Sequence, residues 1–261
     1  MGDQNRDFPD FRVIRNLDTS DYHSMQVQFK RRLGRVVQGL ASYTWSHSID
    51  TASSDFVGSL PRVVMAPEND RGSSDFDIRH AFTAAATIAL PSPEGGPLRT
   101  ILGDWSLNPI VKAYSPTPFN PNQTSNEAFG NALRPNLVVG VNPVIEDSSL
   151  PGGKRFNPEA FQASTTEHGN LGRNSFRGFS LWQADLGLHK HFNFTESVGV
   201  RIGGEFFNLF NIPNFAAPVN NLANAQFGRS TQMLNRSIGG LNPLYQIGGP
   251  RSVQLGLRLE F

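Results

Sequence analysis

The sequence predicts an all-β protein built as an antiparallel up-and-down meander of about seven long strands. The first observation is alternation of apolar and polar residues, clearest over 253–261, because successive side chains of a strand point to opposite faces. The second is composition: 25 glycines, 18 prolines and 20 phenylalanines beside only 17% charged residues are typical of strands joined by Gly/Pro-rich loops. The third is that no apolar run reaches the roughly 18 residues of a transmembrane helix.

Charge and cysteine content exclude several classes of function. The formal net charge is +1, which favours neither a nucleic-acid partner nor an acidic substrate. Cysteine is absent, so a disulfide framework, a thiolate metal site and a cysteine nucleophile are excluded. Residues 1–20 are polar, are broken by Pro9 and are expected to form a loop lead-in. They contain no apolar h-region, so we do not expect a signal peptide there.

Two predicted strands joined by a tight turn begin the meander. Segment 22–33 alternates weakly, Gly34 permits the turn, and segment 35–46 alternates again. A long polar stretch over 47–78 follows. The residues on one side of these two strands are Met25, Val27 and Phe29, then Val37, Gly39, Ala41, Tyr43 and Trp45.

The next two strands are separated by a proline-rich connection. Segment 79–90 is predicted as a strand, and the prolines and glycines of 91–97 indicate a turn. Segment 105–115 contains Pro109, which weakens the strand or marks a bulge or an edge. Residues 116–179, dense in Asn, Pro and Gly, are expected to be the longest irregular region.

Three further strands complete the chain. They are predicted over 181–194, 198–206 and 253–261, with a turn at Thr195-Glu196 and a polar loop over 212–249. Their apolar faces carry Trp182, Ala184, Leu186, Leu188, Phe192 and Phe194; Val198, Val200, Ile202, Gly204 and Phe206; and Val253, Leu255, Leu257, Leu259 and Phe261.

The lengths of the connections indicate a membrane barrel rather than a soluble domain. Short and long connections alternate, so that all the long ones (47–78, 116–179 and 212–249) fall on one edge of the meander. Compact soluble domains rarely carry loops above about 12–15 residues. Outer-membrane barrels combine short periplasmic turns with long extracellular loops. The predicted strands, of about 10–14 residues, also suit a tilted membrane strand better than a soluble one.

The two faces of the strands fit this interpretation. Trp45 and Trp182 lie at long-loop ends and Trp105 at a short-turn end, as two interfacial aromatic girdles require. We therefore expect the apolar faces to point outward to lipid and charges such as Arg201 and Glu205 to lie on the concave side. A soluble sandwich would also expose its charges, so the charged faces alone do not discriminate. The apolar residues expected to point outward include Val198, Val200, Ile202, Leu257 and Leu259.

Several motifs occur together in one order. They are YHSMQVQFKRR (22–32), ASYTWSHSID (41–50), DIRHAF (77–82), GDWSL (103–107) with PTPF (116–119), and GEFFNLFNIPNF (204–215) before the terminal strand. With these motifs the chain resembles the C-terminal portion of the barrel of TonB-dependent outer-membrane receptors. It is most similar to the Oar-like branch, which often carries a carboxypeptidase-regulatory-like N-terminal domain.

The resemblance implies a barrel of twenty-two strands, a plug domain inside it and a TonB box. The plug and the TonB box are not among these residues, so we expect 21–261 to be a partial barrel, from a natural fragment or a truncated gene model. The implied function is uptake of an unidentified extracellular ligand at the bacterial outer membrane, with TonB engaged only through a missing N-terminal part. The alternatives are an outer-membrane structural or adhesin-like binding protein without transport, and a soluble all-β domain.

The terminal strand also resembles the signal read by the barrel-assembly machinery. Gly256, Leu257, Leu259 and Phe261 lie where that signal places glycine, apolar residues and a terminal aromatic residue. Leu255 departs from the pattern, in which a polar residue is usual. The resemblance therefore implies two partners, the assembly machinery and the lipid of the outer membrane.

No catalytic or cofactor motif is present, so we expect a protein that is not an enzyme and binds no cofactor. His189 and His191 share a strand face with Asp185 and could ligate a metal, although two solvated histidines are the favoured interpretation. Two other clusters contain charged side chains. Asp70, Asp75 and Asp77 lack calcium-loop spacing and are expected to be a solvated loop, and Arg201, Glu205, Arg258 and Glu260 are expected to form cross-strand ion pairs.

Overall fold

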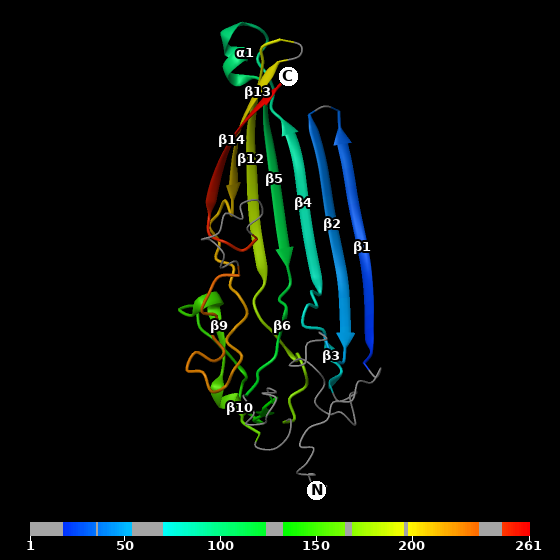
Figure 1. The fold of residues 1–261 in the computed structure, drawn as a ribbon, viewed down its shortest axis with the longest axis vertical. Helices are drawn as coiled ribbons and strands as arrows, with labels where there is room; N and C mark the ends of the chain where they lie inside the picture. Colours follow the sequence, from blue (N-terminus) through cyan, green and yellow to red (C-terminus); the bar gives the residue numbers. More distant parts are fainter. Residues whose placement is uncertain are drawn as a thin grey trace, which may run out of the picture.

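The computed structural model shows one long, curved antiparallel sheet with the long connections gathered at one end (Figure 1). The short connections and the C-terminus lie at the opposite end. The described residues are 18–34, 36–53, 70–123, 133–164, 169–195, 198–234 and 247–261. Of the predicted lead-in, 1–17 lie outside these ranges, as do Arg35 and Glu196 of the two short turns.

The seven predicted strands are confirmed, and each pairs with the next long strand along the chain. The second strand continues to Asp50, beyond its predicted end at 46, and the short strand β3 (Gly72–Ser73) pairs with its last residues. The order across the sheet is β1 (Ser20–Leu33), β2 (Val37–Asp50), β4 (His80–Ala89), β5 (Trp105–Tyr114), β12 (Leu181–Asn193), β13 (Gly199–Phe207) and β14 (Ser252–Glu260).

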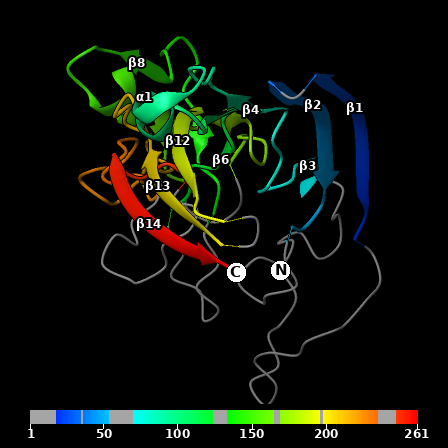
Figure 2. The same ribbon diagram turned by 90° about the horizontal axis from the view of Figure 1, so that it is seen from above.

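The sheet curves into an arc whose ends do not meet (Figure 2). In the part of the chain that is described, β1 pairs only with β2, and β14 pairs only with β13. Both outer strands therefore present unpaired backbone groups. The meander is confirmed, and the barrel is not closed by these strands.

The apolar residues of the seven strands form one continuous face. The strand register aligns Phe29 with Ala41, Ala84, Val111 and Ala184 in a single row across five strands. At the end of the sheet, Leu255 and Leu257 are 81% and 68% exposed. The apolar face is therefore not stacked on a second sheet of the described chain, as it would be in a soluble sandwich.

Pro109 lies inside a central strand and interrupts one ladder. β5 pairs with β12 along its whole length, including Leu186 opposite Pro109. On the other side, pairing with β4 stops after Ala85–Ile110 and resumes at Ile88–Leu107. Because proline has no backbone N–H to donate, the break falls on the β4 side. Of the predicted possibilities, a local irregularity is confirmed and an edge strand is wrong.

The connection between β4 and β5 contains a short helix that the sequence analysis missed. The predicted turn over 91–97 leads into α1 (Gly96–Leu102), which lies at the short-turn end (Figure 1). Leu98 and Ile101 of this helix are 61% and 63% exposed. The Trp105 indole donates a hydrogen bond to the Ile101 carbonyl at 2.9 Å, which fixes the helix to the start of β5.

The connections expected to be irregular instead fold into a small packed unit, which we call the cap. Its described part comprises residues of 115–180 and 208–234. Within the described residues of 116–179, the expectation of an irregular region is corrected only by short strands and 3₁₀ turns. The short strands are β6 (Pro118–Phe119), β7 (Asn136–Leu137), β8 (Val144–Glu146), β9 (Lys154–Phe156), β10 (Phe161–Gln162) and β11 (Phe176–Arg177), with 3₁₀ turns at Pro151–Gly153 and Pro158–Ala160.

The cap holds a cluster of buried apolar side chains. Phe119 and Phe156 stack with ring centroids 4.2 Å apart, and Phe227 from the last long connection packs edge-on against Phe161 at 5.5 Å. This core joins two connections that are remote in sequence, so the cap is held together by its own apolar packing. The buried members are Phe119, Phe156, Ala160, Phe161, Leu171 and Phe227.

The replacement Gly228→Ala is expected to loosen the cap. Gly228 has φ +76°, and an added Cβ would lie 2.4 Å from the Phe156 carbonyl oxygen. Gly140→Ala is the matched control, because Gly140 has φ +83° but nothing within 4 Å of an added Cβ. Hydrogen exchange at the Phe156 amide, which donates to the Gly228 carbonyl at 3.0 Å, should accelerate only for Gly228→Ala. Equal effects of the two replacements would contradict a close approach at Gly228.

Single cysteines should report which face meets lipid, because the natural chain has none. In purified outer membranes, Arg201→Cys should react with a hydrophilic maleimide, whereas the neighbouring Ile202→Cys should be protected by hydrocarbon. The two residues are adjacent in β13 and face opposite sides of the sheet. Faster labelling of Ile202→Cys would reverse the assignment of the faces.

Candidate functional site

The polar face of β5, β12, β13 and β14 contains a hollow of about 480 Å³, which we call the polar hollow. Its walls carry both signs of charge, and its floor includes Gly187, Gly203 and Gly256. Gly203 lies directly opposite Gly256, so two neighbouring strands lack a side chain at the same level. The charged and titratable side chains that line it are Lys112, Asp185, His189, Arg201, Glu205 and Arg258.

The strand glycines allow the lining side chains to lie flat. A Cβ on Gly203 would fall 2.4 Å from the His189 ring, and one on Gly187 would fall 2.7 Å from the Glu205 carboxylate. The imidazole of His189 therefore lies across β13, where its Nε2 is 2.8 Å from Glu205 Oε1. Its Nδ1 is 2.8 Å from the Asn108 amide nitrogen. The histidine is held on both sides by polar partners.

A second group of charges lies toward the short-turn end. Glu260 Oε1 is 3.1 Å from Arg201 Nη2, which confirms a cross-strand ion pair between β13 and β14. Its other oxygen is 3.1 Å from His191 Nε2, without hydrogen-bond geometry. Arg201 lies directly opposite Arg258, so Glu260 offsets two facing guanidinium groups. Glu205 pairs with His189 rather than with arginine.

His189 and His191 keep partly exposed side chains, as the favoured interpretation expects, and each also lies beside a glutamate. Asp185 does not join them. It accepts hydrogen bonds from the Gln183 amide at 2.7 Å and from the Asn208 backbone N–H at 2.9 Å. Within the described residues, no group of three or more His, Asp or Glu side chains is arranged to hold a metal ion.

Toward the cap, the polar hollow is bounded by backbone from the last long connection. Gly248 N–H donates to the Gln183 side chain at 2.7 Å, and Asn208 donates through its amide to the carbonyls of Ile212 and Gly249, both at 2.8 Å. Gln183 and Asn208 are both fully buried. The residues next to β13 and β14 are thus fixed against the polar face of β12.

Three ion pairs tie the β2–β4 side to the β5–β12 connection, and we call them the Arg–Asp network. Three arginines of the β5–β12 connection pair with the aspartate that ends β2 and with two aspartates of the β2–β4 connection. The pairs are Arg134–Asp70, Arg173–Asp50 and Arg177–Asp77.

Arg173 makes the most contacts in the network. Its guanidinium donates to the Asp50 carboxylate at 2.5 Å, to the Asp50 carbonyl at 2.9 Å and to Ser53 Oγ at 2.6 Å. The planar fork of arginine suits several oxygen acceptors at once. Because Asp50 ends β2, this contact fixes the cap directly to the end of a sheet strand.

Asp77 is the most enclosed carboxylate of the network. Burial raises its pKa, but the Ser48 backbone N–H at 2.8 Å and the Arg177 guanidinium at 2.6 Å outweigh burial, so the net pKa is lowered. A lowered pKa in the folded state means that ionised Asp77 stabilises the cap above its ordinary pKa of 3.8. That stabilisation is lost as the pH falls through the lowered value.

The expectation of a solvated acidic loop is therefore wrong for two of its three members. Asp70 and Asp77 are 2% and 1% exposed, and only Asp75 remains in solvent. Buried carboxylates need paired charges, and Arg134 and Arg177 supply them from 64 and 100 residues away in sequence. The sequence analysis missed these arginines, because no local spacing relates Arg173 to Asp50.

The residues of the proposed assembly signal occupy the free outer strand. Gly256, Leu257 and Leu259 belong to β14, and Phe261 follows it with a 100% exposed side chain. Trp105 at the start of β5 and Trp182 at the start of β12 lie near strand ends, as expected for the girdles. Trp45 lies inside β2, because that strand continues beyond its predicted end to Asp50.

An antiparallel meander with one exposed apolar face, one charged face and long connections at a single end defines an integral β-barrel protein of the outer membrane. The family model described as "Outer membrane beta barrel domain" matches residues 2–254. The chain belongs to this family, and its place is the bacterial outer membrane. Comparisons with curated proteins and with solved structures gave no significant match. Among the described residues, no helix is long and apolar enough to span a membrane.

Removal of Arg173 should open the cap. Arg173→Gln leaves Asp50 buried without its cation, and loss of one partner of a buried pair costs about 3–5 kcal/mol. We expect faster hydrogen exchange at two amides of the β2–β4 connection, where this connection meets Arg173: the Ser74 amide, which donates to the Ser48 carbonyl of β2, and the Asp77 amide, which donates to the Ser74 carbonyl.

Arg71→Gln is the matched control, because Arg71 pairs with Asp21 at a site where both side chains are substantially exposed. Exposed pairs contribute little to stability, so this replacement should leave the exchange rates of the two amides unchanged. A larger effect from Arg71→Gln than from Arg173→Gln would show that burial does not decide the strength of these pairs.

Proposed function

We propose that this chain forms the C-terminal strands of the barrel of a TonB-dependent outer-membrane receptor that takes up an extracellular ligand. The observation that carries the proposal is the open arc of seven strands (Figure 2). Barrel diameter grows with strand number. In the proposed receptor these seven strands are part of a barrel with more strands, whose lumen is wide enough for a plug domain.

The two free edges support the same proposal. β1 and β14 each leave one row of backbone N–H and C=O groups unpaired by described residues. Hydrocarbon does not tolerate such groups, because each unpaired one costs several kcal/mol. Additional strands must therefore pair with both edges, and in the proposed receptor they belong to the same barrel.

In this receptor the cap is the surface that meets the ligand. Its aromatic core and the Arg–Asp network make the long connections a fixed structure rather than free loops. A rigid binding surface loses little conformational entropy when a ligand binds. Phe76, Val139 and Phe210 keep exposed side chains on these connections and are available for contact.

The polar hollow lies on the path from the cap to the short-turn end. Its paired charges give water and polar solutes a hydrogen-bonding wall without a large net field. Energy coupling in the proposed receptor requires a plug and a TonB box from sequence outside this chain. No catalytic step is assigned to the chain.

Assembly is proposed to begin at the free outer strand. Gly256, Leu257, Leu259 and Phe261 would be read by the barrel-assembly machinery, as the resemblance of the terminal strand implies. Exposure of β14 supports this, because an accessible edge can pair with another strand.

The second candidate is an outer-membrane adhesin-like protein, which the independently packed cap favours. The two candidates differ in their partners. We expect that the protein purified from outer membranes through a tag inserted after Val139 carries a plug domain detected by peptide mass spectrometry. It should also cross-link to TonB, and an uncoupler that collapses the proton gradient should reduce the cross-link.

A strain that lacks TonB is the control for the cross-link. Purification without a plug domain and without any energy-dependent cross-link would contradict the receptor and leave the adhesin-like protein as the better candidate.

A further inference from the structure

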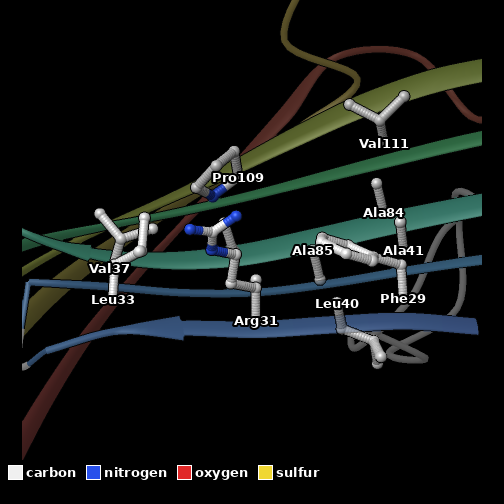
Figure 3. A pocket seen from close by; sticks show the side chains of 12 residues that line it. Phe29, Arg31, Leu33, Val37, Leu40, Ala41, Ala84, Ala85, Pro109 and Val111 are labelled. Atoms are coloured by element: carbon white, nitrogen blue, oxygen red, sulfur yellow. The ribbon is translucent and has the colours of Figure 1, made fainter.

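The apolar face has a hollow of its own, of about 370 Å³, which we call the apolar hollow (Figure 3). It lies over β1, β2, β4 and β5, on the opposite face of the sheet from the polar hollow. Its volume falls within the range of roughly 300–1,000 Å³ that is usual for small-molecule sites. Nearly all of its lining atoms are carbon.

The hollow exists because four small residues lie next to one another on two paired strands. Gly39 and Ala41 of β2 lie opposite Ala86 and Ala84 of β4 in the strand register. Larger side chains surround this floor, with Phe29 and Leu33 on β1 and Val111 on β5. Small residues at the centre and large ones at the rim leave a depression in the apolar face.

One lining residue does not fit a lipid-facing surface. Arg31 lies between Phe29 and Leu33 on the same face, opposite Gly39, and its side chain lies along the hollow (Figure 3). No carboxylate of the described residues pairs with it. A guanidinium on a lipid face is costly unless it reaches a polar group at the membrane surface. An anion from outside the chain is the partner that this position lacks.

The depth of Arg31 suits such a partner. It lies two residues before the end of β1, so it is about 7 Å from the short-turn end of that strand. A long arginine side chain can extend from that depth to the headgroup layer while its methylene groups remain on the apolar surface. Guanidinium also binds phosphate through two parallel hydrogen bonds.

We propose that the apolar hollow is a binding site for one anionic phospholipid. One acyl chain fills the floor formed by Gly39, Ala41, Ala84 and Ala86, and the phosphate contacts Arg31. A free phosphate ion would leave the apolar floor empty, and a purely apolar occupant would leave the guanidinium without a partner. Only a molecule that joins an acyl chain to a phosphate headgroup of net negative charge satisfies both parts of the site, because the choline of a zwitterionic lipid already neutralises its phosphate. The inference depends on the outer-membrane location and not on the proposed receptor function.

The test uses the full protein purified from outer membranes and native mass spectrometry, with phosphatidylglycerol and phosphatidylcholine as probes. We expect one tightly held phosphatidylglycerol. Arg31→Gln should weaken its retention about tenfold, the usual scale for loss of one charge-assisted contact. Arg32→Gln is the matched control, because Arg32 faces the opposite side of the sheet and its Nε donates to the Gly34 carbonyl at 3.3 Å.

A second variant tests the acyl-chain part independently. Ala84→Leu fills the floor without changing charge, and it should reduce retention of both lipids. Heat-modifiable migration on gels confirms that each variant is folded. The proposal is overturned if Arg31→Gln and Arg32→Gln bind equally, if Ala84→Leu has no effect, or if the two lipids bind alike. Occupation of the hollow by a second copy of the chain, seen as a dimer in the same spectra, would also overturn it.

Discussion

The structure depends on the hydrogen-bond ladder between neighbouring strands, because no water is available in hydrocarbon to bond backbone groups. Each long strand of the chain pairs with its sequence neighbours, and these ladders satisfy the backbone of the sheet except along the outer edges of β1 and β14. The polarity of the side chains on each face can then match the medium that the face contacts. The result is a sheet with no packed interior of its own, since hydrocarbon covers one face and water covers the other.

The buried core of the protein consequently lies in the connections. Phe119, Phe156 and Phe227 pack together at the long-loop end, and the Arg–Asp network fixes this unit to the ends of the strands. The two kinds of interaction have different roles. Aromatic packing supplies most of the driving force, whereas buried ion pairs are costly to desolvate and favour one arrangement of partners over others. The cap therefore has a defined structure although its strands are only two or three residues long.

The sheet could be predicted from sequence and the cap could not, for a physical reason. Alternation is a local property, so segments such as 181–194 and 253–261 reveal both their structure and their faces. The residues that pack or pair in the cap are far apart in sequence, as Arg173 and Asp50 are, and no periodic pattern in the sequence relates them.

The same limit applies to the sites. The Arg201–Glu260 pair follows from adjacent strands, but the partners of Asp70 and Asp77 lie in another connection. Lys190 illustrates a third case: it breaks the apolar alternation of β12, and its ammonium group bonds to the Gly103 carbonyl beside α1.

Helix α1 presents exposed apolar side chains at the short-turn end of the sheet. Its exposed leucine and isoleucine side chains favour the boundary between headgroups and acyl chains, and Trp105 favours the same layer. Moving the sheet toward the outside of the cell would bring this helix into hydrocarbon. Moving it toward the periplasm would remove the helix from its lipid contacts. The β4–β5 connection is thus suited to the interface between headgroups and acyl chains. Displacement of the sheet along the membrane normal would therefore be opposed at this connection.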